Sequence, residues 1–135
     1  MQSLRELMVD TKEAWVSYPG SEKFEVLVAN LARDKLIALR KKCIETRFDR
    51  KTRQPIEELN EKKFITEFSG ATIKNWRGLT LKQLETMILI NTGEADPESE
   101  LEYSPENAEL LVSNSAEFDT WLNETVFDLD NFRTK

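Results

Sequence analysis

Apolar and polar residues alternate near the start of the chain, in two short runs that flank a turn dipeptide. The run "EAWVSY" precedes Pro19 and Gly20, and the run "KFEVLVAN" follows them. In the second run Phe24, Val26 and Val28 fall on one face, because side chains alternate along an extended backbone. Two such runs around a Pro-Gly turn predict a β-hairpin. Its second face is also partly apolar, so we expect the hairpin to pack on helices.

The stretch from Asn30 to Phe48 shows helical spacing. Asn30 can cap a helix, since its side-chain oxygen accepts a free backbone N–H of the first turn. The apolar residues of the stretch fall on one broad arc of a helical wheel; they are Leu36, Ile37, Leu39, Cys43, Ile44 and Phe48. Arg40 lies inside this arc, so we expect it to be partly buried and to meet a carboxylate or backbone carbonyls. The segment "DRKTRQP" has no periodicity and is predicted to be an exposed loop.

A second helix is predicted to begin after Asn60 and to end near Gly78. Its apolar positions recur at helical spacing and are Phe64, Ile65, Phe68, Thr72 and Trp76. We therefore expect Trp76 to be a structural core residue, and Gly78 to supply the backbone freedom that a sharp turn between helices requires. Thr80 and Gln83 then match a capping box, which predicts a new helix from about residue 81.

The C-terminal part is predicted to contain a loop followed by two helices. Residues 92–103 are acidic with Gly and Pro, which indicates a mobile loop. Ser104 and Pro105 are typical of a helix start, and Asn114 with Glu117 offers a second capping pair. The last helix has an apolar face made of Phe118, Trp121, Leu122, Thr125, Leu129 and Phe132. Together the elements predict a single domain over residues 1–135, of the α+β class but mainly α, with a short N-terminal β-hairpin packed on about five helices.

Charge is distributed unevenly along the chain. The 19 basic and 25 acidic residues give a net charge of −6. Residues 33–53 contain nine Lys or Arg against three Asp or Glu, a net of +6, whereas residues 92–135 contain twelve acids against two bases, a net of −10. Segments of opposite charge favour docking within the chain or binding of an oppositely charged partner.

The residue types that most catalytic and metal sites need are missing from the sequence. There is no histidine, and Cys43 therefore has none to activate it as a nucleophile. The four glycines never cluster into a phosphate-binding loop. Asp128 and Asp130 resemble part of a calcium loop, but the Gly and the distal Glu of that loop do not follow. We expect no enzymatic activity, no cofactor and no metal site.

Nucleic acid and membrane are not expected as partners. The basic run around Lys41, Arg47 and Arg50 could contact phosphates, but a pI of about 4.9 and the acidic C-terminal half would repel a polyanion. No apolar run reaches the roughly 20 residues that cross a bilayer, and the N-terminus lacks the layout of a signal peptide. We therefore expect a cytoplasmic protein.

Four segments taken together resemble the small tail assembly chaperones of long-tailed bacteriophages. In chain order they are "FEVLVANLARDKLIALRKKC", "IKNWRGL", "YSPENAELL" and "FDTWLNETVFDLDNF". The resemblance implies a non-enzymatic, mostly helical protein that is made in the infected cell and is absent from the finished virion. It also implies that the protein binds unassembled tail-tube subunits, the tape-measure protein or both, and prevents their premature polymerisation.

The surface that binds such a partner is expected in the terminal elements, because these can contact a partner with the least disruption of the core. The candidates are Phe118, Trp121, Leu122 and Phe132 of the last helix, followed by Trp15 and Phe24 of the hairpin. Core packing is the alternative interpretation for all of these residues, and for Trp121 it is at least as well supported. Two other functions stay open: a permanent tail-completion or head-to-tail joining protein of the virion, and a host adaptor or regulator. Self-association also stays open.

Overall fold

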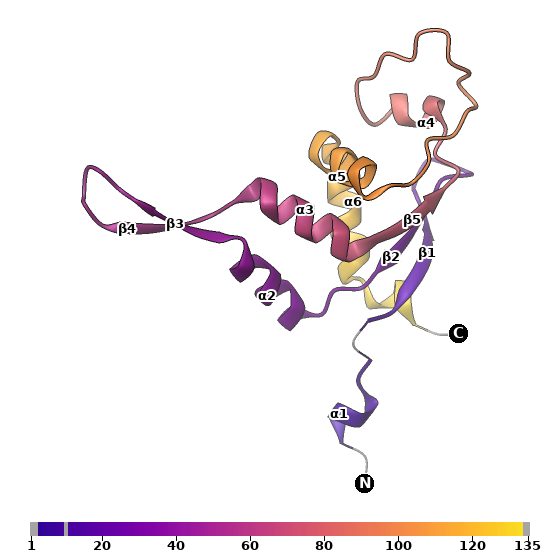
Figure 1. Cartoon of the computed structure of the whole chain (residues 1–135). Coiled ribbons are helices and arrows are strands. Elements are labelled where there is room, and N and C mark those ends of the chain that lie inside the picture. Colours follow the sequence, from indigo (N-terminus) through magenta and orange to yellow (C-terminus); the bar gives the residue numbers. More distant parts are fainter. Residues whose placement is uncertain (1–2, 10, 134–135) are drawn as a thin grey trace.

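The computed structural model describes residues 3–9 and 11–133 and contains two antiparallel sheets together with helices (Figure 1). Its elements are α1 (Leu4–Leu7), β1 (Glu13–Ser17), β2 (Glu25–Ala29), α2 (Arg33–Lys42), β3 (Ile44–Phe48), β4 (Pro55–Leu59), α3 (Glu61–Thr72), β5 (Ile73–Arg77), α4 (Leu81–Glu85), α5 (Pro105–Asn114), α6 (Ala116–Phe127) and the 3-10 helix η1 (Leu129–Phe132). Helix accounts for 44% of the structure and strand for 21%. The prediction of a mainly helical fold is therefore wrong, because segments predicted as helix form strands.

The predicted N-terminal hairpin is confirmed. β1 and β2 pair antiparallel, from Glu13 opposite Ala29 to Ser17 opposite Glu25. The turn between them contains Gly20, whose φ of +82° lies in the left-handed region that strains other residues. The three residues that the alternation placed on one apolar face are all fully buried.

β5 adds a third strand on the other side of β2, giving the order β1-β2-β5. Here the sequence prediction of a helix through Trp76 is wrong. α3 ends at Thr72, and the next five residues form β5, four of which have a partner in β2; Trp76 lies opposite Val26. β1 covers only one edge of β2, and pairing with β5 satisfies the backbone N–H and C=O groups of the other edge.

The second sheet consists of β3 and β4 alone, and it replaces the second half of a predicted helix. α2 ends at Lys42, after which Ile44–Phe48 pairs antiparallel with Pro55–Leu59. Asn30 does not cap α2; its side chain accepts a hydrogen bond from the backbone N–H of Lys12 at 2.6 Å. The segment predicted as an exposed loop is exposed, but it forms the tip of this hairpin.

Arg40 is consequently placed differently from the prediction. It is exposed, and its guanidinium carbon lies 5.6 Å from the ring centre of Phe64, a cation–π arrangement. Among the described residues it forms no ion pair. The expected pairing of a buried Arg40 with a carboxylate is wrong, because the helical wheel assumed that Ile44 and Phe48 continued the helix.

The starts of α3, α4 and α5 lie where capping residues predicted them. The side chains of Asn60, Thr80 and Ser104 each accept a hydrogen bond from the backbone N–H three residues ahead, at 3.0 to 3.1 Å. α6 is capped by Ser115 instead of the predicted Asn114. A cap is a contact within one turn, so it can be recognised without knowledge of the tertiary structure.

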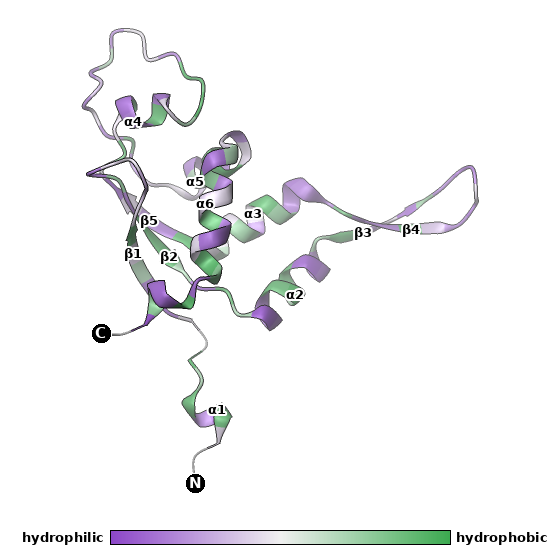
Figure 2. Cartoon of the chain, turned by 180° about the vertical axis from the view of Figure 1, so that it is seen from behind, coloured by the Kyte–Doolittle hydropathy of each residue, from purple (hydrophilic) through white to green (hydrophobic). Residues whose placement is uncertain are grey.

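The core lies between the three-stranded sheet and the helices α3, α5 and α6, which pack on one another and on β2 and β5 (Figure 1). Aromatic rings join the layers: Phe24 of the hairpin stacks on Phe118 of α6 and meets the edge of Trp76 of β5, both at 6.4 Å between ring centres. Figure 2 shows hydrophobic residues on the sheet and inner helices, and hydrophilic residues at the hairpin tip formed by β3 and β4.

Candidate partner-binding surfaces

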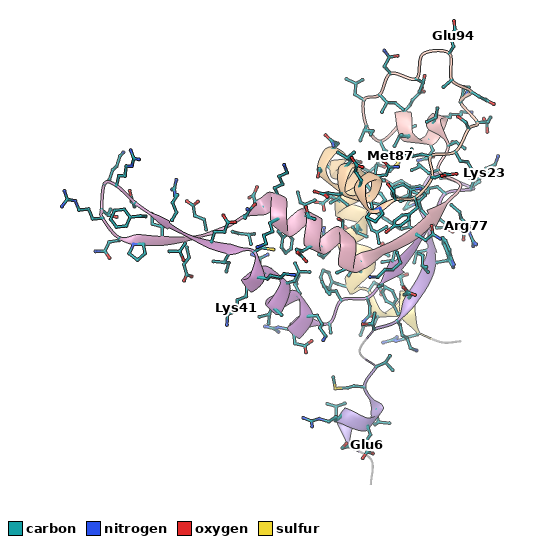
Figure 3. All side chains as sticks on the ribbon, viewed as in Figure 1. Glu6, Lys23, Lys41, Arg77, Met87 and Glu94 are labelled. Atoms are coloured by element: carbon teal, nitrogen blue, oxygen red, sulfur yellow. The ribbon has the colours of Figure 1, made fainter. Side chains whose placement is uncertain are left out.

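The hairpin of β3, β4 and the connecting residues 49–54, called the arm below, projects away from the body of the protein (Figure 1). Its root is closed by a hydrogen bond from the backbone N–H of Asn60 to the carbonyl of Cys43 at 2.9 Å. All five residues of β3 are exposed. In Figure 3 the arm's side chains extend into space that no other element occupies. The arm therefore presents both of its outer edges to solvent.

One face of the arm is largely apolar. Residues opposite each other in an antiparallel pair point to the same side, and the register places Ile44 opposite Leu59 and Phe48 opposite Pro55. Ile44 is 43% exposed and Phe48 is 62% exposed. On the other face Arg47 forms an ion pair with Glu58 at 2.8 Å. The arm thus carries an uncovered apolar face backed by a charged one.

The tip of the arm is an ordered, basic turn. The carboxylate of Asp49 accepts hydrogen bonds from the backbone N–H of Lys51 at 3.0 Å and from the hydroxyl of Thr52 at 3.1 Å. Arg53 adopts a left-handed conformation with φ of +58°. Among the described residues, the side chains of Arg50, Lys51 and Arg53 form no ion pair. Three cations therefore stand together at the end of the arm.

A groove on the body, the Tyr18 groove, lies between the β1–β2 turn and the first turns of α6. Its volume is about 410 Å³, and its lining includes Tyr18, Pro19, Glu117, Thr120, Trp121 and Glu124. Glu117, Thr120, Trp121 and Glu124 of α6 lie at i, i+3, i+4 and i+7, which is one face of a helix. The Trp121 ring meets the Tyr18 ring edge-on at 5.0 Å and lies 5.6 Å from Phe118. The groove is therefore an aromatic surface flanked by two carboxylates.

Tyr18 is unusual among the groove residues. Its side chain is 2% exposed, yet its hydroxyl has no hydrogen-bond partner among the described residues. Burial, followed by the negative charge of Glu117, raises the pKa of Tyr18 to about 12. Glu117 therefore acts on the phenol through its charge and, more weakly, as a hydrogen-bond acceptor, although the two groups lie outside the distance and angle limits of a full hydrogen bond. An unpartnered buried hydroxyl costs about 1–3 kcal/mol.

Most of the residues predicted to bind a partner lie in the core. Phe24, Phe118 and Leu122 have no exposed surface, and Phe132 is 8% exposed. A partner could reach these four only by opening the packing between the sheet and α6. Trp121 is half-buried and lines the Tyr18 groove, so it keeps an accessible face.

Trp15 is the most accessible of the predicted partner-binding residues. It is 38% exposed on β1, one of the two edge strands of the three-stranded sheet. The guanidinium of Arg77 lies 4.1 Å from its ring centre and also forms an ion pair with Glu25 at 3.0 Å. One ring face is therefore covered by Arg77. The partner-binding role of Trp15 and Trp121 stays a prediction.

Trp76 and Gly78, predicted to be structural, hold the junction after β5. Trp76 is 4% exposed, and its indole N–H donates a hydrogen bond to the carbonyl of Leu101 at 2.9 Å. Gly78 has φ of +75°, and a Cβ atom there would lie 2.0 Å from the carbonyl oxygen of Lys23. The close approach, as well as the backbone angle, requires glycine at this position.

Sequence reasoning missed both the arm and the Tyr18 groove. The arm had a detectable signal, because Ile44, Thr46 and Phe48 alternate with charged residues as in a strand. Part of the groove could also be detected in the sequence, because Glu117, Trp121 and Glu124 share a helix face next to the apolar stripe. Nothing local indicated that Tyr18 would complete it.

No group of side chains that could hold a metal ion occurs within residues 3–9 and 11–133. None of the helices in that part of the chain combines the length and apolar character that crossing a membrane requires. Comparisons with models of protein families, with curated protein sequences and with solved structures give no match to this chain.

Proposed function

We propose that this protein is a non-enzymatic tail assembly chaperone, which binds the unassembled tube-forming subunit of a phage tail and keeps it from polymerising until assembly begins on the tape-measure protein. The observation that carries the proposal is the arm, a two-stranded extension with open edges and an exposed apolar face. The choice of a phage tail subunit as the binding partner comes from the resemblance of four ordered segments to tail assembly chaperones.

An arm of this kind is poorly explained by stability alone. An isolated two-stranded hairpin is only marginally stable in water, because it has little apolar surface to bury. Here Ile44 and Phe48 remain exposed instead of packing on the body. A free strand edge can add a strand from another protein through backbone hydrogen bonds, while an apolar face beside it gives affinity. The arm therefore has the properties of a binding element.

These properties match what a tail chaperone must do. A subunit that polymerises exposes sticky edges or apolar patches before assembly, and a protein that masks them needs exposed apolar surface of its own. It also needs charge to keep the complex in solution, and charged residues make up 33% of this chain. In the proposed role the protein acts in the cytoplasm of the host cell and is absent from the finished virion.

Light scattering of the purified cognate tube subunit tests the proposal. A molar excess of the wild-type protein should suppress polymerisation. Phe48→Ser, which removes the most exposed apolar side chain of β3, should weaken suppression by about tenfold or more in the concentration required. Leu110→Ser is the matched control, because Leu110 is 51% exposed on α5, outside the arm; it should suppress like the wild type.

Two results would contradict the proposal. If the subunit polymerises at the same rate with and without the protein, the tube subunit is not its client. If Phe48→Ser suppresses as well as the wild type, the arm is not the binding surface. Mass spectrometry of purified virions addresses the structural-component alternative: a chaperone is missing from them, whereas a tail-completion or joining protein is present in a fixed ratio.

A further inference from the structure

The Tyr18 groove has the chemistry of a binding site for a basic side chain. The carboxylates of Glu117 and Glu124 flank Trp121 on one face of α6. Neither carboxylate forms an ion pair within the described part of the chain. An aromatic face attracts a cation through its quadrupole, and carboxylates accept the hydrogen bonds of a guanidinium or ammonium group. An arginine or lysine side chain would satisfy both features at once.

Tyr18 forms the buried part of the groove wall. Its hydroxyl is buried and has no hydrogen-bond partner among the described residues. Buried polar groups are paired in most native structures. Tyr18 and Glu117 both line the groove, and the pKa of Tyr18 is raised by burial and by Glu117. The ring of Tyr18 thus helps to form the aromatic wall beside Trp121.

The tip of the arm carries the complementary group. Arg50, Lys51 and Arg53 are exposed and lack carboxylate partners in residues 3–9 and 11–133. The turn built on Asp49 presents them at the far end of a hairpin. An arginine there offers N–H donors in a planar fork and can stack on an indole ring. Its chemistry matches the two carboxylates and Trp121.

A single molecule cannot bring the two surfaces together. The arm extends to one side of the body, whereas the β1–β2 turn that borders the groove lies on the other, near Lys23 (Figures 1 and 3). The chain thus carries both halves of a complementary contact and keeps them apart.

We propose that the Tyr18 groove of one molecule binds the arm tip of a second copy, with an arginine of the tip on Trp121 and between Glu117 and Glu124. Two such contacts can form in one dimer, each arm reaching the other body. The inference goes beyond the proposed function and does not depend on it, because it uses the cations of the tip and not the apolar face of β3.

Sedimentation of the purified protein alone tests the proposal. The wild type should associate with a dissociation constant below about 1 mM, and the association should weaken as ionic strength rises from ~0.1 M to ~1 M, because salt screens exposed charges. The variants Arg50→Glu/Arg53→Glu and Glu117→Lys/Glu124→Lys should each weaken it by more than about tenfold. Lys35→Glu/Lys41→Glu is the matched control, because it makes the same charge change on exposed residues of α2. This control should associate about as well as the wild type.

Mixing the Arg50→Glu/Arg53→Glu variant with the Glu117→Lys/Glu124→Lys variant tests the contact most directly. In the mixture a reversed tip meets a reversed groove, and a native tip meets a native groove, so both contacts are complementary again. We expect a complex to form only in the mixture. The proposal is overturned if the wild type sediments as a monomer at about 1 mM, if the control on α2 is impaired as much as the tip variant, or if the mixture does not recover association.

Discussion

Replacing Gly78 with alanine should be among the most damaging single changes in this protein. Gly78 has φ of +75°, and a Cβ atom would lie 2.0 Å from the carbonyl oxygen and 2.6 Å from the carbonyl carbon of Lys23. Both contacts are far shorter than van der Waals distances and involve backbone. Lys23 lies just before β2, which pairs with β5 through Glu25 opposite Arg77. Relief of the overlap therefore requires the ends of two paired strands to move.

The size of the effect can be worked out from two controls in the same chain. Left-handed backbone costs an L residue about 1–2 kcal/mol. Gly20 has φ of +82° with nothing within 4 Å of an added Cβ, so Gly20→Ala measures that cost alone. Gly70 lies in α3 with open space around its Cβ position, so Gly70→Ala should stabilise by up to about 1 kcal/mol through helix propensity. The overlap at Gly78 adds roughly 2–3 kcal/mol of strain, which gives about 3–5 kcal/mol in total.

Urea unfolding followed by tryptophan fluorescence measures these differences as shifts in the free energy of unfolding. The expected order of stability is Gly70→Ala, wild type, Gly20→Ala and, well below them, Gly78→Ala. If the free energies of unfolding of Gly78→Ala and Gly20→Ala differ by less than about 1 kcal/mol, the backbone at Lys23 can move at little cost, which contradicts the expected effect of the close approach.

Three further changes test other parts of the structure. Trp76→Phe should cost about 1–2 kcal/mol in urea unfolding, because the indole N–H that binds the Leu101 carbonyl at 2.9 Å is lost from a buried position; an unchanged stability would contradict this. Ser115→Ala should cost about 1 kcal/mol, because the serine hydroxyl oxygen accepts the backbone N–H of Phe118 at 3.1 Å at the start of α6; thermal unfolding checks it. Tyr18→Phe should be at least as stable as the wild type at neutral pH, since it removes an unpartnered hydroxyl. Because the folded-state pKa of Tyr18 is raised to about 12, the unfolded chain loses this proton first, and the wild type should lose stability relative to Tyr18→Phe as pH rises from 10 towards 12; parallel pH profiles would refute the shift.

Local contacts made part of the fold predictable. Asn60, Thr80 and Ser104 each bind a backbone N–H only three residues away, so their sequence pattern located three helix starts. The Pro-Gly turn and the alternation around it located the first hairpin for the same reason.

The strands that were missed depend on less local information. β5 exists because β2 has a free edge, and β2 lies far away in the sequence. The residues from Ile44 to Phe48 satisfy both a helical arc and a strand alternation, and their pairing with β4 decides between the two. The candidate site shows the same limit: the face of α6 around Trp121 could be anticipated, but its contact with Tyr18 arises only when hairpin and helix pack together.

Hydrogen exchange on the complex with the cognate tube subunit tests the central claim most directly. The account predicts that a complex elutes on size exclusion, and that within it the outward-facing backbone amides of β3 and β4 exchange at least about tenfold more slowly than in the free protein. Amides of α3 and α5, which are already in helical hydrogen bonds, should change little. A failure to form any complex, or a complex in which the arm's amides exchange as fast as in the free protein, would contradict the account.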